Sequence, residues 1–536
     1  MRLLLGSAED AAAAVGLRFN PSKSATLHLK GAGTARVRDT RFSIQGSEMR
    51  SMREGEAYEH LGVPTGFEVR QTPDLSIDGL VGDLRKLDQS LLAPWQKLEI
   101  AATFILPRLD FCLQGSHVEK GPLSKADKVV MRLVKGWMHL PQRASPEVVF
   151  LPPNMGGGGL LPFADMADLY TIAHAFKFLS SRDAAVSGLA LASLECVAAK
   201  RLGRAAAEQD LADYLSGVVD GDFARPSADT ASLWSHARNA ARRASAALGL
   251  RWVWCAERRE LGVECRRPSG NTITVTPQAR SQVVRRLRSA LVAHYRERLL
   301  TKKDQGKVYE VTSRSRVGNH FMRSGSFTRF AEWRFIHRAR LDVLPLNATK
   351  RWQTGGDKRC RKCGAHLETL PHVIQHCRSN CVAITKRHDG VLDRLVKALK
   401  IPGTVSVNRT VDGVDLEWVQ LRPDLVVRDE ARKKIVIVDV AVPFENRSVA
   451  LEEVRSQKLA KYQGLAACLE RQGYDVKLMP FLFGALGGWD AGNERVIRLL
   501  GINRRYAVMM RRLMISDTIR WSRKVYIEHV SGARQY

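Results

Sequence analysis

Four side chains that bind metals, all within residues 360–377, constrain the fold of this chain more than any other feature. Their spacing is Cys360-x2-Cys363-x8-His372-x4-Cys377. A Cys-x2-Cys pair forms a tight turn, which Gly364 permits, and positions 372 and 377 lie roughly one helical turn apart, so all four side chains can face one point. Three thiolates and one imidazole suit zinc, and a site closed by four protein ligands is structural. We therefore predict a structural Zn²⁺ site.

The same stretch offers alternative ligands, namely His366, His376 and Cys381. Four of the nine cysteines in the chain fall between residues 360 and 381. This clustering differs from a disulfide framework spread through a secreted fold, and it indicates a reducing compartment and a metal. The competing interpretation, unrelated cysteines that bind nothing, is weakened by the Cys-x2-Cys spacing.

A second informative stretch is residues 421–462. Two short runs rich in Val and Ile are joined by a charged turn, which predicts a hairpin of buried strands. Each run carries one aspartate, Asp424 or Asp439. A carboxylate in an apolar strand is costly unless a partner neutralises it, and a divalent cation would neutralise both. Downstream, Lys458 and Lys461 are three residues apart in a helical pattern and share a helix face.

Two acids and a lysine around a metal are what phosphodiester hydrolysis needs. The metal polarises the phosphate and lowers the pKa of a water, and the lysine stabilises charge on the phosphate oxygens. Strand alternation places Ile437, Asp439 and Ala441 on one face, and Glu445 is a reserve third carboxylate for Mg²⁺. The simpler interpretation is a hairpin whose aspartates face solvent, which the two aspartates alone would favour. The lysines and the cysteine cluster together favour a nuclease.

The charge balance predicts a polyanionic partner. The chain has 84 Lys and Arg against 55 Asp and Glu, a formal charge of +29 and a pI near 10.1. Residues 281–360 hold 19 basic and 6 acidic side chains, a net +13. We expect Arg285, Arg286 and Arg288 to contact phosphates. Nucleic acid is favoured over a membrane because no apolar run reaches the roughly 18 residues of a spanning helix.

Aromatic residues are interleaved with the arginines of this basic segment. They either stack on bases or form the core between helices, and the sequence favours neither. These aromatic residues are Tyr295, Tyr309, Phe321, Phe327, Phe330, Trp333 and Phe335.

The remainder of the chain has mainly helical patterns. Residues 7–15 predict a helix that Gly16 ends, alternation at 25–29 predicts a strand, and residues 58–66 predict a strand followed by a turn. The periodicity of residues 141–345 is mainly helical. The alanine-rich segments that we expect to form packed helices are 164–216 and 228–248.

The N-terminal motifs resemble part of a known enzyme family. Gly16-Leu17-x2-Asn20-x2-Lys23, followed by Tyr58-x2-Leu61-Gly62-Val63, is similar to the last two palm motifs of non-LTR retrotransposon reverse transcriptases, and residues 81–113 resemble their thumb. In that family the polymerase aspartates lie N-terminal to these motifs, in Tyr/Phe-Ala-Asp-Asp. This chain has no Asp-Asp pair, and Phe163-Ala164-Asp165-Met166 lies downstream of the thumb with Met in place of the second Asp. The resemblance therefore implies the C-terminal part of a longer polyprotein, without polymerase chemistry.

The C-terminal motifs resemble the same family. The cysteine cluster is similar to the zinc knuckle that precedes the endonuclease of site-specific, ribosomal-DNA-inserting non-LTR retrotransposons, and the similarity continues at 341–346 and 387–389. Arg422-Pro423-Asp424, Asp439 and Lys458-x2-Lys461-Tyr462 match its restriction-like endonuclease. In the common restriction-enzyme pattern a lysine stands two residues after the second acid. Here that residue is Ala441, so the resemblance implies that Lys458 or Lys461 takes the place of the catalytic lysine.

The resemblance also implies a role for each candidate residue at this end of the chain. The implied catalytic residues are Asp424, Asp439, Lys458 and Lys461. The implied nucleic-acid contacts are Arg422 and Tyr462.

We thus expect a multidomain α+β protein, with a mostly helical thumb and linker, a small zinc knuckle and a C-terminal α/β restriction-endonuclease-like domain with a mixed sheet. The predicted domains are a palm remnant at 1–70, a thumb at 71–150, a basic helical linker at 151–345, a CCHC zinc knuckle at 346–390 and the endonuclease at 391–536.

The function that the resemblance implies is Mg²⁺-dependent nicking of target DNA to prime reverse transcription. The expected partners are target DNA and element RNA, and the expected location is the nucleus. The alternative is a non-catalytic nucleic-acid-binding fragment of a degenerate element. The presence of both acids and both lysines argues against that decay.

Overall fold

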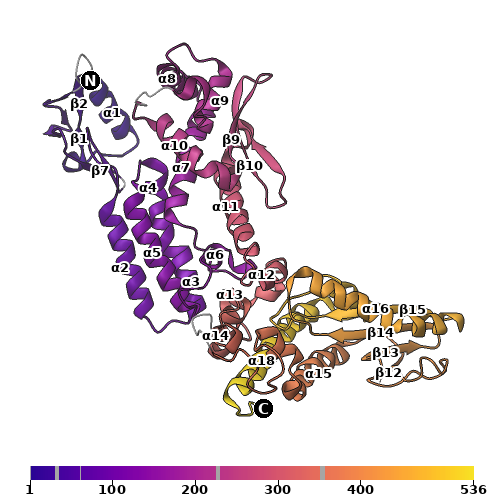
Figure 1. Cartoon of the computed structure of the whole chain (residues 1–536). Coiled ribbons are helices and arrows are strands. Elements are labelled where there is room, and N and C mark those ends of the chain that lie inside the picture. Colours follow the sequence, from indigo (N-terminus) through magenta and orange to yellow (C-terminus); the bar gives the residue numbers. More distant parts are fainter. Residues whose placement is uncertain (1, 31–35, 61, 225–229, 350–355) are drawn as a thin grey trace. The chain divides into compact units, whose positions relative to one another are not determined.

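The computed structural model describes residues 2–30, 36–60, 62–224, 230–349 and 356–536, and it mixes helices with several small sheets (Figure 1). The chain forms two compact units. The first unit comprises residues 1–86, 103–129 and 162–290. The second comprises residues 87–102, 130–161 and 291–536. The cysteine cluster and the predicted nuclease hairpin both belong to the second unit.

Short strands and one helix make up the N-terminal region. Helix α1 (Arg2–Ala14) stops before Gly16, whose φ of +75° is unfavourable for other residues, so the predicted helix end is confirmed. Leu61, part of the predicted Tyr-x2-Leu-Gly-Val motif, lies outside the described residues. The strands here are β1 (Ala25–Thr26), β2 (His28–Lys30), β3 (Arg36–Arg38), β4 (Ser43–Ile44), β5 (Ser47–Glu48), β6 (Arg50–Ser51), β7 (Tyr58–His60) and β8 (Val63–Thr65). β1 pairs with β6 in parallel, and β2–β3, β4–β5 and β7–β8 are hairpins.

Helices dominate the next two hundred residues, as predicted. The carboxylate of Asp127 accepts hydrogen bonds from the Phe163 and Ala164 amides (2.7 and 3.1 Å), so Phe163-Ala164-Asp165-Met166 begins a helix. Alanines of α7 and α10 are buried where these helices pack together. The helices are α2 (Asp74–Gln89), α3 (Pro94–Ile100), α4 (Asp110–Gly115), α5 (Lys120–Trp137), α6 (Glu147–Phe150), α7 (Phe163–Leu179), α8 (Ala184–Leu202), α9 (Glu208–Ser216) and α10 (Leu233–Leu248).

One sheet lies inside the region that we expected to be a helical linker. It is antiparallel, with the order β11–β10–β9. Alternation accounts for part of it, because Trp252 on β9 and Cys265 on β10 are fully buried between more exposed neighbours, whereas Leu261, Gly262 and Val263 are buried in a row. Its strands are β9 (Arg251–Cys255), β10 (Glu260–Arg266) and β11 (Thr272–Val275).

The second unit joins helices to a four-stranded mixed sheet of order β12–β13–β14–β15. The predicted hairpin is confirmed, since β13 and β14 pair antiparallel around a charged turn. The strands are β12 (Thr404–Val407), β13 (Leu425–Asp429), β14 (Lys434–Ala441) and β15 (Asp475–Leu482). The helices from residue 283 onward are α11 (Val283–Leu300), α12 (Lys307–Thr312), α13 (Phe321–Ser324), α14 (Phe330–Arg340), α15 (Cys381–Ala398), α16 (Arg447–Arg471), α17 (Asn493–Leu499) and α18 (Arg504–Ser531).

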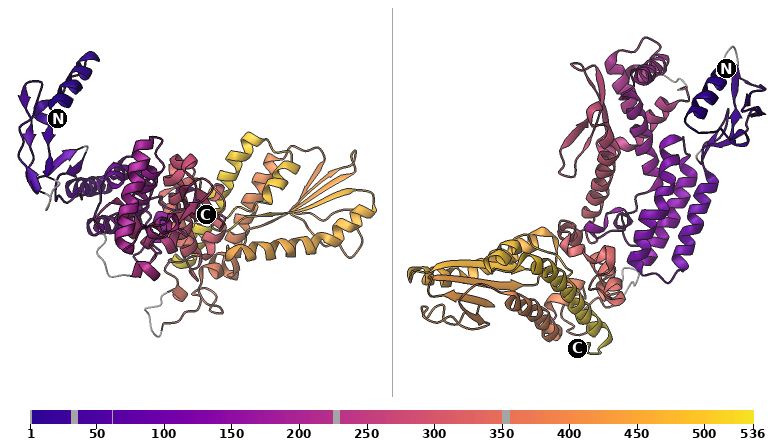
Figure 2. Two further views of the ribbon diagram at one scale, coloured as in Figure 1. Left: turned by 90° about the horizontal axis from the view of Figure 1, so that it is seen from above. Right: turned by 180° about the vertical axis from the view of Figure 1, so that it is seen from behind.

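Helix α16 is the crossover from β14 to β15, which pair in parallel, and it runs beside the sheet (Figure 2). A core cluster joins Ile435 and Ile437 of β14 to Leu465 and Leu469 of α16. Ala441 of the same strand packs in a second cluster at the start of α16. The face of β14 that carries alternate residues 437, 439 and 441 therefore looks toward α16, as strand alternation predicted.

Candidate functional site

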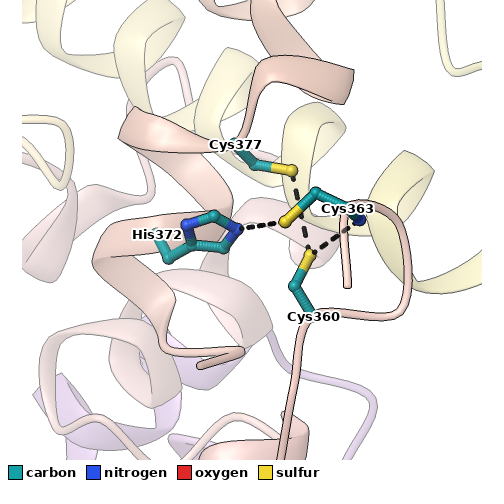
Figure 3. A group of neighbouring side chains, drawn as sticks. All are labelled: Cys360, Cys363, His372 and Cys377. Carbon is teal, nitrogen blue, oxygen red and sulfur yellow. Dashed lines mark hydrogen bonds between the residues drawn. The ribbon is translucent and has the colours of Figure 1, made fainter. Parts of the chain in front are cut away.

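The four predicted zinc ligands converge on one point (Figure 3). Their ligand atoms all lie within 4.8 Å of one another. Cys360 Sγ is 3.8 Å from Cys377 Sγ, and Cys363 Sγ is 3.4 Å from His372 Nε2. A tetrahedral zinc with bonds of about 2.3 Å to sulfur and about 2.0 Å to nitrogen has ligand separations of about 3.8 Å and about 3.5 Å. The side chains therefore fit a tetrahedral metal such as zinc.

Local backbone structure creates this arrangement. Gly364 has φ +64°, which closes the turn after the Cys-x2-Cys pair. Amide donors of that turn, first Ala365, lower the pKa of the Cys363 thiol. A short π-helical turn separates His372 from Cys377, and the Cys377 amide donates to the His372 carbonyl oxygen at 2.7 Å. Positions 372 and 377 therefore face the same side, as the spacing predicted.

The three alternative ligands do not join this group. His366, His376 and Cys381 are all exposed, whereas Cys360, His372 and Cys377 are buried and Cys363 is half-buried. Of the candidates that the sequence offered, the Cys360, Cys363, His372 and Cys377 set is the one whose ligand atoms lie together.

Two buried groups beside this centre were not found from the sequence. His529, near the end of α18, has Nε2 3.0 Å from Glu368 Oε1 and 3.7 Å from Cys360 Sγ. Glu368 is fully buried, yet its pKa falls to about 2, because hydrogen bonds from Arg361, the Asn347 amide and His529 outweigh the effect of burial. No local spacing marks His529, since it lies more than 150 residues from the cysteines it approaches.

The two predicted catalytic aspartates lie opposite each other on the hairpin. Leu425 pairs with Val438, so the antiparallel register brings Asp424 opposite Asp439. Asp439 is 2% exposed, and Lys458 Nζ lies 2.5 Å from its Oδ2. The Lys458 ammonium neutralises the charge of Asp439. The angle of this contact is poor for a hydrogen bond, so Asp439 Oδ2 accepts no well-aligned hydrogen bond.

Asp424 is oriented by groups from two elements. Its Oδ2 accepts a hydrogen bond from the Val440 amide at 2.6 Å and lies 3.3 Å from His388 Nε2. Burial alone would lower the pKa of His388, but the hydrogen bond and the charge of Asp424 raise it to about 9. His388 lies on α15, and apart from the family similarity at residues 387–389 no sequence pattern predicted a role for it.

The two lysines differ in position. Lys458 reaches Asp439, whereas Lys461 is exposed and its Nζ lies 4.7 Å from the centre of the Tyr462 ring. Tyr462 itself is fully buried in the core between α16 and the sheet, and its hydroxyl donates to the Arg422 carbonyl oxygen at 3.1 Å. The expectation that Tyr462 contacts nucleic acid is therefore wrong. Arg422 is exposed, and its predicted nucleic-acid contact stays a prediction.

Glu445 is not placed as a third carboxylate of this pair. It is fully buried, and its Oε1 accepts hydrogen bonds from the Leu486 and Gly488 amides (2.9 and 2.8 Å). Burial raises its pKa. Among the described residues, Asp424 and Asp439 join no close group of three or more His, Cys, Asp or Glu ligand atoms. The expectation of Glu445 as a metal ligand is corrected accordingly: it holds the loop that follows β15.

The basic segment has both exposed charge and buried rings. Arg285 and Arg288 on α11 are exposed and Arg286 is half-buried. Five of the seven interleaved aromatic residues are at most 7% exposed, which favours the core interpretation for them. Phe327 and Phe330 are exposed, at 46% and 55%, and Phe330 stacks on Trp95 with ring centres 5.3 Å apart.

Among the described residues, every helix is too short or too polar to span a membrane.

Several of the known proteins that this chain is similar to are Pol polyproteins of retrotransposable elements. No family model matches the chain. It is 23% identical over 507 residues to a Pol polyprotein from a type-1 retrotransposable element R2 of Bradysia coprophila, covering 92% of this chain and 48% of that protein. It is 25% identical over 341 residues to an uncharacterized protein of Caenorhabditis elegans, covering 61% of this chain and 95% of that protein. A third relative, the Pol polyprotein of element R2DM of Drosophila melanogaster, is 29% identical over 166 residues, which is 30% of this chain and 15% of that protein. The chain thus spans about half the length of the Bradysia polyprotein.

Proposed function

We propose that this chain, which is related to the Pol polyproteins of R2 retrotransposable elements, is a Mg²⁺-dependent DNA endonuclease with a restriction-like fold. It nicks target DNA so that the new 3′ hydroxyl primes reverse transcription of the element RNA in the nucleus. The observation that carries the proposal is the pairing of Asp439 with Lys458 on a strand register that sets Asp424 opposite.

The residues at this end of the hairpin fit a magnesium ion. Mg²⁺ prefers oxygen ligands, and the Asp424 and Asp439 carboxylates supply oxygens at this end of the hairpin, where the Lys458 ammonium also lies 2.5 Å from Asp439 Oδ2. Asp424 and Asp439 would hold the ion, with Asp424 oriented by the Val440 amide and His388. A Mg²⁺ ion bound there would supply polarisation of the phosphate and a lowered pKa for a water. Lys458 stabilises the charge that develops on the phosphate oxygens.

The other parts of the chain supply binding and support. The metal knuckle, which we take to hold zinc in a structural role, stabilises the region beside the nuclease sheet. The exposed arginines of α11 contact the phosphates of DNA and RNA. We assign no polymerase chemistry to this chain, because it contains no Asp-Asp pair to hold the metals of nucleotidyl transfer.

A plasmid-nicking assay tests the proposal. Supercoiled DNA should become open-circular with the purified chain in Mg²⁺, and should stay supercoiled in chelator or with Asp424→Asn. Binding is measured on the same samples by filter retention in chelator. A protein that binds DNA tightly but leaves the plasmid intact in Mg²⁺ and Mn²⁺ would instead support the alternative of a non-catalytic nucleic-acid-binding fragment.

A further inference from the structure

The buried end of helix α18 reaches the metal knuckle. His529 is 1% exposed, and its ring lies between Asn380, Glu368 and Cys360, three residues of the knuckle region. We propose that His529 is a positioning residue of the knuckle: its Nε2–H donates to Glu368 and to the Cys360 sulfur, and metal binding thereby depends on the docking of α18. This inference rests on the proposed metal occupancy of the knuckle and is independent of the nuclease activity.

The hydrogen-bond network fixes which ring nitrogen of His529 carries the proton. Lys362 Nζ donates to Asn380 Oδ1 at 3.2 Å, and Asn380 Nδ2 donates to the Val373 carbonyl oxygen at 2.9 Å. Both contacts set the same orientation of the Asn380 amide. Its second N–H therefore points to His529 Nδ1, 3.0 Å away. Since Nδ1 accepts this hydrogen bond, the neutral ring carries its proton on Nε2.

The Nε2–H group faces two acceptors. Glu368 Oε1 is 3.0 Å away, and Cys360 Sγ, at 3.7 Å, is within reach of a hydrogen bond to sulfur. A thiolate bound to a metal retains negative charge, and a donor beside it stabilises that charge and fixes the side chain.

A competing interpretation treats Cys360, Glu368 and His529 as a second metal site, because their ligand atoms also lie within 4.8 Å of one another. Two observations oppose it. Glu368 already accepts from the Arg361 side chain at 2.7 and 2.8 Å and from the Asn347 amide at 2.8 Å. The His529 nitrogen that faces the group carries a proton, and a metal ligand must present a lone pair.

Further contacts tie α18 to the helix that follows the knuckle. Arg394 Nε on α15 donates to Asp517 at 2.7 Å, and Arg387 Nη1 donates to Ser522 Oγ at 3.0 Å. Both acceptors lie near the middle of α18, so the helix is fixed to α15 there and to the knuckle at its end. Loss of the metal should therefore loosen the end of α18, and loss of His529 should loosen the metal.

The first measurement is metal affinity of the full chain, by competition for Zn²⁺ with a chromophoric chelator. Removing a hydrogen-bond partner of a metal ligand typically weakens metal binding about 10- to 100-fold, and we expect His529→Ala to fall in that range. Ser531→Ala, an exposed substitution two residues away, is the matched control and should keep wild-type affinity. Wild-type affinity in His529→Ala would overturn the inference.

The second measurement separates positioning from a general loss of structure. Co²⁺ replaces Zn²⁺ in the knuckle, and the thiolate-to-cobalt charge-transfer band is recorded. Without its donor the Cys360 thiolate gives up an electron more easily, so the band of His529→Ala should move to longer wavelength. His529→Gln, whose amide keeps an N–H near the Nε2 position, should restore both band and affinity in part, and it also serves if His529→Ala fails to fold.

The outcomes distinguish a failure of this inference from a failure of the proposed metal site or of the proposed nuclease activity. A wild-type chain that retains neither Zn²⁺ nor Co²⁺ would refute the metal knuckle itself. A wild-type chain that binds metal, with an unchanged band in both His529 variants, would refute only the role of His529. Neither the metal-affinity measurement nor the cobalt spectrum depends on plasmid nicking.

Discussion

Replacement of Asp439 by Asn is the sharpest test of the nuclease site. The change removes a charge and almost no volume from a residue that is 2% exposed. Lys458 loses its partner at 2.5 Å, but its side chain is 27% exposed and can turn toward water, so folding should lose about 1 kcal/mol or less. The nicking rate should fall far more. If the metal contributes about 4 kcal/mol of transition-state stabilisation, its loss slows nicking about a thousandfold at about 1.4 kcal/mol per factor of ten.

The assay pairs nicking of supercoiled plasmid in Mg²⁺ with DNA binding in chelator. Affinity should stay the same or rise slightly, because an anion near the phosphates has been removed. Asp429→Asn is the matched control: it lies on the same hairpin but pairs with Arg432 at the turn, 3.3 Å away, and should nick normally. A wild-type rate in Asp439→Asn would end the assignment. Simultaneous loss of binding and nicking would show that Asp439 only supports the fold.

Three further predictions address metal, charge and pH. Cys363→Ser should release the metal and unfold the knuckle, because metal binding supplies folding free energy to such modules; metal analysis and limited proteolysis check this, with the exposed Cys381→Ser as control. Charge reversal of the three arginines at the start of α11 should reduce the slope of log K against log salt by about one unit per lost phosphate contact, and an unchanged slope would contradict it. Burial opposes ionisation of Glu147, but Lys302 at 2.6 Å lowers its pKa below the usual 4.5, so its stabilisation exists above that pH and disappears as the pH falls. Glu147→Gln should therefore melt at a lower temperature at pH 7 and lose less stability on acidification, which thermal melts between pH 3 and pH 7 would reveal.

The metal centre and the hairpin were predictable because their information is local. The knuckle needs four ligands within 18 residues, and the hairpin needs two apolar runs joined by a short turn. Spacing and periodicity report both directly. Alternation along β14 placed Asp439 on the same face as Ile437, and that face meets α16. Lys458 on α16 forms an ion pair with Asp439.

What the sequence did not show depends on packing between distant segments. His388 and His529 act through helices α15 and α18, whose positions beside the sheet and the knuckle no local pattern encodes. Tyr462 follows the predicted lysines in the motif, but its place on the helix turns it inward, into the core. Glu445 looked like a spare carboxylate, yet its oxygens bind backbone amides of a loop some forty residues later.

Helix α18 has a consequence for where a cut would fall on DNA. Its 28 residues form one continuous helix of about 42 Å, at about 1.5 Å per residue. Contacts at Asp517, Ser522 and His529 fix it to α15 and to the knuckle, and His388 of α15 lies against Asp424, so packed helices set the distance from the knuckle to the aspartates. If the proposed nuclease cuts DNA that also touches the knuckle, this fixed distance sets how far the nick lies from that contact.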